Sequence, residues 1–341
     1  MLKKFKEFIK NMSYKRLIGI IIIETVIIFK DVFIELFSFL NQFNSETLDT
    51  IKMYYNNFNV LYEKYKYFFY VIYVCSFSLI GFKLYLKKEK IKVMIVNSLG
   101  NTKVNILTRY LEEDTSFEKD FGEAVKLLEN NISEYKQIVK KLDDTAEEFM
   151  SAKKENNYAF AGILHTPFAL RLGYKIGDET YFKLFHKKRK EDKFKLLKEK
   201  EEYCGNYSKL NVEKRLAESD ELIVSISTTF PITEMQLEKF NVSNSNYLKF
   251  ETLDKGFDII YSEKQVNEYK DLIFKEIRKI TSSKKIKVIR LCISSSVAFT
   301  FALGQGFSEK YDSKVIIYNY ENQQYTWGIK LFEDAENSIE I

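Results

Sequence analysis

Four short turns in this 341-residue chain combine small hydroxyl and amide residues with the start of a helix, which is a pattern typical of anion sites. Each turn follows a short apolar run and precedes helix-like sequence, so backbone N–H groups at a helix N-terminus would face it. Hydroxyls and such N–H groups bind phosphate oxygens. The candidate ligand-binding residues are Asn97, Ser98, His165, Thr166, Thr228, Thr229, Ser294, Ser295 and Ser296. Helix capping alone explains roughly half of these positions, because Ser and Thr are also standard N-cap residues.

Two aromatic residues near the end of the chain, Tyr320 and Trp327, complete the predicted ligand site. An aromatic ring that stacks on a base stabilises binding by about 1 to 3 kcal/mol. An aromatic plug over the edge of a sheet is an equally good interpretation of this pair.

The elements that must position these turns form a duplicated α/β unit. Short apolar runs predict strands at 91–96, 159–164, 181–186, 222–227, 288–293 and 314–320. Helix-like sequence predicts helices at 102–113, 168–173, 232–240, 263–280 and 297–304, and one long helix or a broken pair of helices at 121–153. The strand and turn at 222–231 repeat those at 91–101 with an offset of 131 residues, and the same offset places Gly173 on Gly304. We therefore expect an α/β fold of two Rossmann-like halves, about 88–205 and 206–341, whose turns face one shared cleft. The charged stretch 186–202 is more typical of a solvated helix face or loop than of a binding element.

The first 87 residues indicate a two-helix transmembrane module. Apolar stretches at about 17–40 and 67–86 are long enough to span a bilayer, and basic residues precede the first and close the second. Both termini and the domain 88–341 are therefore predicted to be cytoplasmic. Glu24, Asp31 and Glu35 share one stripe of the first span, which suits a pore or a helix interface; exit of the helix near Lys30 would instead leave the later acids among lipid headgroups.

Charge and motif content exclude several classes of protein. Residues 87–341 carry 42 Lys/Arg against 41 Asp/Glu, so the sequence lacks the basic excess that long nucleic acid requires. Three dispersed cysteines and two histidines predict no metal site, and no P-loop, zinc-protease or nucleophile-elbow motif occurs. We expect a chain without catalytic residues, metal or cofactor, although His165 beside Thr166 leaves a phosphodiesterase open.

The sequence resembles the SAVED domain, a fusion of two CARF-like halves. The resemblance covers about 88–332 and rests on 164–174 (LHTPFALRLGY), 293–296 (ISSS), 302–307 (ALGQGF) and 315–318 (VIIY). The triplet Ser294 to Ser296 departs from the small apolar residues and proline that family members tend to carry.

A SAVED domain behind two transmembrane helices implies a membrane effector of the cyclic-oligonucleotide-based antiphage signalling system (CBASS) in the bacterial inner membrane. The implied ligand is a cyclic di- or trinucleotide made by a partner CD-NTase. Binding would produce a homo-oligomer whose helices contact lipid and breach the membrane, which leads to abortive infection. The alternatives are a membrane-anchored phosphodiesterase that degrades the messenger, and a membrane scaffold without a small ligand.

Overall fold

The computed structural model describes residues 91–99, 104–106, 116–121, 132–151, 157–178, 181–188, 191, 193–197, 209–256 and 259–341. The predicted spans 17–40 and 67–86, with Glu24, Asp31 and Glu35, lie outside these residues. Among the residues that are described, no helix has the length and apolarity needed to cross a bilayer. Residues 89–341 form one compact unit.

Within the described ranges, the first sheet has five strands in the order β2-β1-β3-β4-β5. Its strands are β1 (Lys92–Asn97), β2 (Ser116–Asp120), β3 (Tyr158–Ile163), β4 (Phe182–His186) and β5 (Lys195–Leu196). The first four strands are parallel, and only β5 is antiparallel to its neighbour β4. The carboxyl ends of β1, β3 and β4 therefore meet at one edge.

The second sheet has seven strands in the order β12-β11-β10-β9-β7-β8-β6. They are β6 (Leu210–Arg215), β7 (Glu221–Ser227), β8 (Asn246–Thr252), β9 (Val288–Ser294), β10 (Lys314–Glu321), β11 (Gln324–Lys330) and β12 (Ile339–Glu340). The central strands β8, β7, β9 and β10 are parallel, whereas the outer strands pair antiparallel. The carboxyl ends of the four central strands again share one edge.

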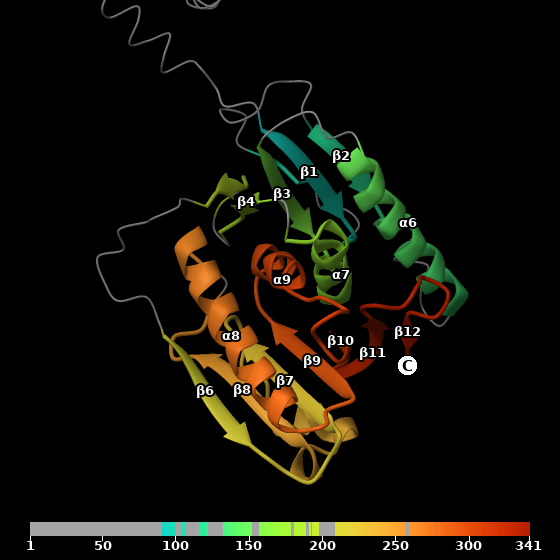
Figure 1. Ribbon diagram of the computed structural model, residues 1–341. Coiled ribbons are helices and arrows are strands. Elements are labelled where there is room, and N and C mark those ends of the chain that lie inside the picture. The colour runs from blue at the N-terminus through green and yellow to red at the C-terminus, as the bar shows by residue number, and fades with distance from the viewer. Residues whose placement is uncertain are drawn as a thin grey trace, which may run out of the picture. The chain divides into compact units, whose positions relative to one another are not determined.

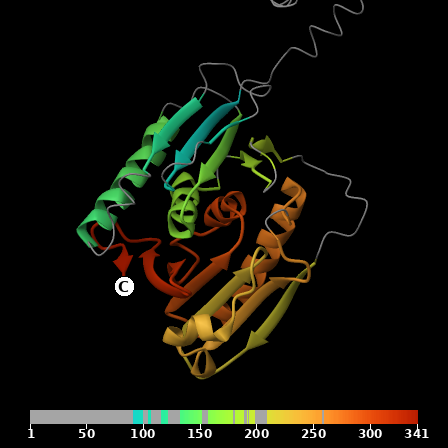
Figure 2. The ribbon, with the colours of Figure 1, turned by 180° about the vertical axis from the view of Figure 1, so that it is seen from behind.

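The described helices are α6 (Ile132–Ser151), α7 (Thr166–Ile176), α8 (Glu263–Ser283) and α9 (Val297–Gly304), and two short 3₁₀ helices, η2 (Glu234–Phe240) and η3 (Val242–Asn244), cover the outer face of the second sheet. Helices α7 and α9 lie between the two sheets, while α6 lies along the first sheet and α8 along the second (Figure 1). All four α-helices contribute residues to a common core. Strand residues alternate between the shared core and the outer faces: Val96 faces the core, whereas Ile95 faces outward. Figure 2 shows the same layers from behind, with α7 and α9 between the sheets.

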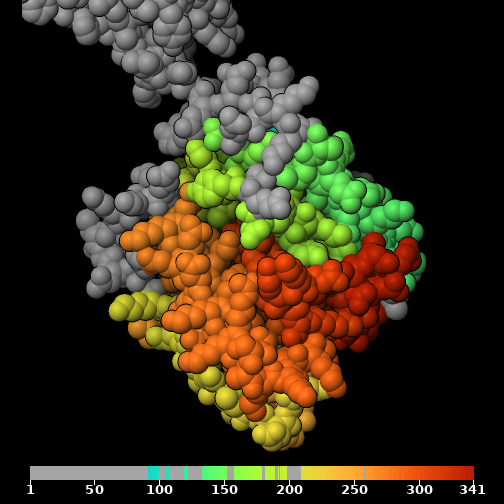
Figure 3. All heavy atoms as spheres, in the orientation of Figure 1, coloured from blue at the N-terminus to red at the C-terminus, as the bar shows by residue number. Residues whose placement is uncertain are grey.

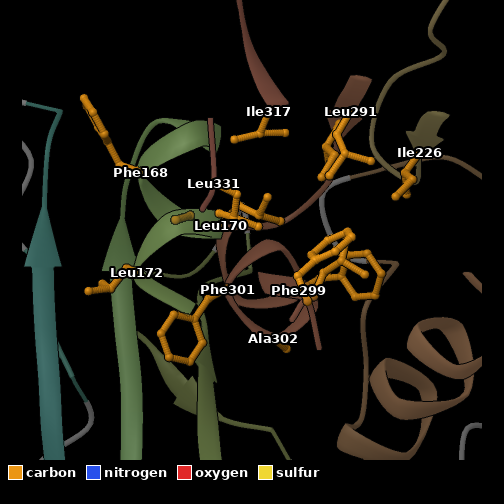
Figure 4. Packing of buried hydrophobic residues seen from close by; sticks show 14 of the residues in the cluster. Phe168, Leu170, Leu172, Ile226, Leu291, Phe299, Phe301, Ala302, Ile317 and Leu331 are labelled. Carbon is orange, nitrogen blue, oxygen red and sulfur yellow. The ribbon is translucent and has the colours of Figure 1, made fainter. Parts of the chain in front are cut away.

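The close crossing of α7 and α9 depends on two glycines. A methyl group built on Gly173 would lie 2.0 Å from the carbonyl oxygen of Phe301, and one built on Gly304 would lie 2.1 Å from that of Leu170. Leu170 and Phe301 are related by the same 131-residue offset as the two glycines. The contact is therefore reciprocal, and its side chains are among the buried residues in Figure 4.

A buried arginine joins the first half to the C-terminal segment. Arg171 on α7 is fully buried and forms a two-pronged ion pair with Asp143 on α6, at 2.8 Å and 2.6 Å. Its remaining donors bond the backbone oxygens of Lys330, Leu331 and Glu333. Figure 3 shows the red C-terminal segment against the green α6 surface.

The mixed α/β prediction is confirmed, and the six predicted strands begin and end within about two residues of their predicted positions. Strands β2, β5, β6, β8, β11 and β12 were not predicted. The predicted helix at 232–240 is instead a 3₁₀ helix, because the Gln236 N–H bonds the Thr233 carbonyl three residues back and Asn241 ends it in the left-handed conformation. Of the predicted helix at 102–113 only 104–106 are described, and they are not helical: Ile106 is buried and pairs with Phe194.

Candidate functional site

A cavity of about 820 Å³ opens where the carboxyl edges of the two sheets meet. It is lined by Gly162, Ile163, Thr166, Phe185, His186, Lys187 and Phe194 from the first half, and by Thr229, Phe230, Pro231, Ile232, Gln236, Ile293, Ser294, Ser295, Ser296, Val297, Ala298, Tyr320 and Tyr325 from the second. The walls are largely apolar with hydroxyls among them, and the volume is within the range of small-molecule sites.

The turns of the second half are held together by their own hydroxyls. Ser294 Oγ lies 2.9 Å from Thr229 Oγ1 and accepts the Phe230 N–H at 3.1 Å, and Ser295 Oγ lies 2.8 Å from Thr228 Oγ1. These bonds join the turn after β7 to the turn after β9. The backbone at the cavity floor is therefore fixed before any ligand arrives.

The turns of the first half are joined by a serine and a histidine. His165 donates its backbone N–H to Ser98 Oγ at 3.0 Å, and the same oxygen lies 2.9 Å from His165 Nδ1. Burial lowers the pKa of His165, while the charge of Glu321 opposes that shift. The neutral ring can thus accept the Ser98 proton at Nδ1.

The two pairs of turns are related by the internal repeat. The Ser98 N–H bonds the Ile163 carbonyl at 2.8 Å, and the Thr229 N–H bonds the Ser294 carbonyl at 3.1 Å, with equivalent residues 131 apart. Both pairs lead into helices: α7 begins after His165, and α9 begins after Ser296, whose Oγ accepts the Phe299 N–H at 3.3 Å. The cavity therefore faces two helix N-termini, which favour negative charge.

The outer wall of the cavity is aromatic and amide-bearing. Phe230 and Tyr320 are 55% and 45% exposed, and the Tyr320 ring lies 5.2 Å from that of Tyr325. Gln236 Nε2 donates to Tyr320 Oη at 2.7 Å, which ties η2 to the end of β10. The cavity lining therefore combines aromatic rings with serine and threonine hydroxyls.

Lys187 is the only lysine or arginine among the described residues of the cavity lining. It is exposed and follows β4, so its ammonium can reach a ligand at the cavity mouth. Within the described ranges no group of three His, Cys, Asp or Glu residues could hold a metal ion.

The structure brings most of the predicted ligand-binding residues to one place. Thr166, Thr229, Ser294, Ser295, Ser296 and Tyr320 line the cavity. Asn97, Ser98, His165 and Thr228 lie outside this lining; the last three bond the turns, while Asn97 Nδ2 bonds Asp120 Oδ2 at 3.3 Å.

The structure does not bring Trp327 to the cavity. Its side chain is 6% exposed, and its ring packs 4.6 Å from Tyr135 and 5.7 Å from Phe168. This position matches the plug interpretation of Trp327, because an apolar ring covers core residues there instead of facing the ligand space.

Several lining residues were not predicted as site residues. Phe230 lies within a predicted turn, His186 ends the strand predicted at 181–186, and Lys187 follows it. The rule that ligands collect at strand carboxyl ends would therefore have found them. Lys187 belongs to the charged stretch interpreted as solvated. Gln236 and Phe194 reach the cavity lining through packing between segments that are distant in sequence, and no local sequence pattern predicts such packing.

The residues that line the cavity lie within a segment that matches a known sequence family. Residues 142–331 match the SAVED profile, the SMODS-associated and fused to various effectors sensor domain. The chain belongs to the SAVED family. The resemblance inferred from LHTPFALRLGY and ISSS is therefore confirmed, and the cavity lies in a SAVED sensor domain.

Two solved structures of SAVED/CARF-domain containing receptors are among those similar to this chain. The Acinetobacter baumannii Cap4 SAVED/CARF-domain containing receptor with the cyclic trinucleotide 2'3'3'-cAAA is 14% identical, with a TM-score of 0.48, over 83% of this chain and 66% of that chain. The Moraxella osloensis Cap4 SAVED/CARF-domain containing receptor is 14% identical, with a TM-score of 0.44, over 73% and 52%. This chain thus spans 66% and 52% of the lengths of these two receptors. A comparison with curated protein sequences found no match.

Proposed function

We propose that the SAVED domain of this chain binds a cyclic oligonucleotide in the cavity between its two halves. The observation that carries the proposal is the shared cavity of about 820 Å³, which two helix N-termini and a row of serine and threonine hydroxyls face. A phosphodiester ring needs such donors on one side and ring faces for its bases on the other. Cap4 receptors solved with cyclic trinucleotides suggest a first ligand class to test.

The proposed role is that of a CBASS effector. A partner CD-NTase would supply the cyclic di- or trinucleotide, and occupied sensor domains would assemble into a homo-oligomer. The predicted transmembrane helices, with Glu24, Asp31 and Glu35, would then disrupt the inner membrane and cause abortive infection. Support for this part comes from the apolar stretches and flanking basic residues of the first 87 residues.

The proposal makes the site a binding site and not a catalytic one. His165 Nδ1 is engaged in a hydrogen bond with Ser98 Oγ, and His165 is not one of the residues that line the cavity. A general acid or base must come within hydrogen-bond reach of the reacting atoms. This arrangement supports a sensor over a phosphodiesterase.

The test uses the full chain in detergent micelles, titrated with a panel of cyclic di- and trinucleotides by calorimetry. At least one ligand should bind, and Lys187→Glu should weaken its affinity about tenfold or more, because a charge-assisted bond is worth roughly 1.5 to 3 kcal/mol. The matched control is Lys188→Glu, since Lys188 has the same charge change but lies outside the cavity lining. Equal loss in both variants would place binding elsewhere.

The remaining alternatives give distinct outcomes. Mass spectrometry of the incubated nucleotide should recover it unchanged, whereas a linear product would favour the phosphodiesterase. Absence of binding to every panel member would favour the scaffold. Dye leakage from proteoliposomes that contain the full chain should begin on addition of the bound nucleotide; intact vesicles would overturn the membrane-disruption step.

A further inference from the structure

The hydroxyl of Tyr320 is held in one hydrogen-bonding role by its neighbour. The backbone N–H of Thr233 can only donate, and it donates to Gln236 Oε1 at 2.9 Å. The oxygen end of the Gln236 amide is therefore fixed toward Thr233. Its Nε2 group then faces Tyr320 Oη at 2.7 Å as a donor.

This chain of bonds leaves the Tyr320 proton available for a ligand. Because Tyr320 Oη accepts from Gln236, the remaining strong role of the phenol is that of a donor. No other hydrogen bond to this hydroxyl is found within the described parts of the chain. Both side chains line the cavity, and Tyr320 is 45% exposed.

We propose that Tyr320 is a ligand-recognition residue that donates a hydrogen bond to an acceptor atom of the bound nucleotide, and that Gln236 positions it. The inference rests on the proposed binding of a cyclic oligonucleotide in this cavity. Phosphate oxygens and unprotonated base nitrogens are acceptors of the required kind. A phenol hydroxyl that is free to rotate could donate a hydrogen bond to a ligand or accept one from it. The Tyr320 hydroxyl already accepts from Gln236, so it favours a ligand atom that accepts a hydrogen bond.

Neighbouring residues favour this role for Tyr320. The ring is supported from one side by Tyr325, which is 2% exposed, with 5.2 Å between ring centroids. The 3₁₀ helix that carries Gln236 is also joined to β11 by Lys239, which donates a hydrogen bond to the Thr326 carbonyl. The donor is therefore held by ordered parts of the cavity wall.

The experiment measures affinity of the full chain by calorimetry, with cyclic triadenylate as the first probe and then the panel member that binds most tightly. Tyr320→Phe removes only the hydroxyl and should weaken binding roughly 3- to 10-fold. Gln236→Glu gives Tyr320 a carboxylate that accepts its proton, so binding should weaken at least as much. The fold-loss of affinity in the double variant should be smaller than the product of the two single fold-losses, because both substitutions remove the same hydrogen-bond donor.

The matched control is Gln324→Glu, which introduces the same charge at an exposed position at the start of β11, outside the cavity lining. It should bind within about twofold of the parent, a difference of roughly 0.4 kcal/mol. Parent-like binding by Tyr320→Phe, or equal losses in Gln236→Glu and Gln324→Glu, would overturn the inference. If the unchanged protein binds no panel member, the proposed function itself fails, which is a separate and earlier outcome.

Discussion

His165 connects the two turns of the first half and also makes them sensitive to pH. Burial lowers its pKa below the ordinary value of 6.5, so the folded chain binds this proton less tightly than the unfolded chain does. The contribution of His165 to the free energy of unfolding is therefore fully present above pH 6.5. It is lost as the pH falls from 6.5 toward the lowered pKa of the folded state.

We therefore expect the His165→Gln variant to show a weaker dependence of stability on pH than the parent. Urea unfolding of the full chain at pH 7.5 and 5.5 measures this difference in the free energy of unfolding. Ser98→Ala is the control, because it removes the hydrogen bond but leaves the titrating ring. Parallel pH profiles for the parent and His165→Gln would refute the assignment of this pH dependence to His165.

At the scale of elements, the crossing of α7 and α9 depends on two glycines whose replacement cannot be absorbed by side-chain motion. The atoms that a new methyl group would meet are backbone carbonyl oxygens, at 2.0 Å and 2.1 Å. Gly173→Ala and Gly304→Ala should each lower the free energy of unfolding by about 1 to 3 kcal/mol or more, because the helices must move apart.

The double variant should cost less than the sum of the single variants, since one separation of the helices relieves both clashes. Gly256→Ala is the control: its added methyl group would meet only an Ile259 side-chain carbon, at 3.9 Å. Chemical denaturation measures the free energy of unfolding of the two single variants, the double variant and the control. Strict additivity of Gly173→Ala and Gly304→Ala would contradict the reciprocal contact.

The same helices show how far the sequence predicts this molecule. The offset of 131 residues between Gly173 and Gly304 was visible because both glycines follow strands of similar length and composition. The offset led to the prediction of two related halves. The turns after the predicted strands, together with the aromatic pair near the end of the chain, predicted six of the lining residues, including Ser294 and Thr229. Local patterns could not place Gln236 or Phe194, because their positions depend on which distant strands they pack against. The burial of Trp327 depends likewise on Tyr135 and Phe168, which are far from it in sequence.

At the scale of the whole sensor domain, the halves share one core and should unfold as one unit. Helices α6 and α7 of the first half and α8 and α9 of the second belong to the same buried apolar cluster. Arg171 adds bonds from α7 to the C-terminal segment, and an arginine at 0% exposure cannot lose those partners without a large cost. Because the two sheets bury their inner faces in the same core, neither sheet can unfold while the other stays folded.

Native-state hydrogen exchange of the full chain tests this cooperativity. Amides of β1 and β3 should exchange with the same maximum opening free energy as those of β7 and β9, and a nucleotide held at about 100 times its Kd should raise both by roughly 2.7 kcal/mol. Ligand protection confined to the second sheet would contradict both the common core and a site shared between the halves. A lower opening free energy for β1 and β3 without ligand would instead show that the first half opens alone, and that the Arg171 bonds do not couple it to the rest.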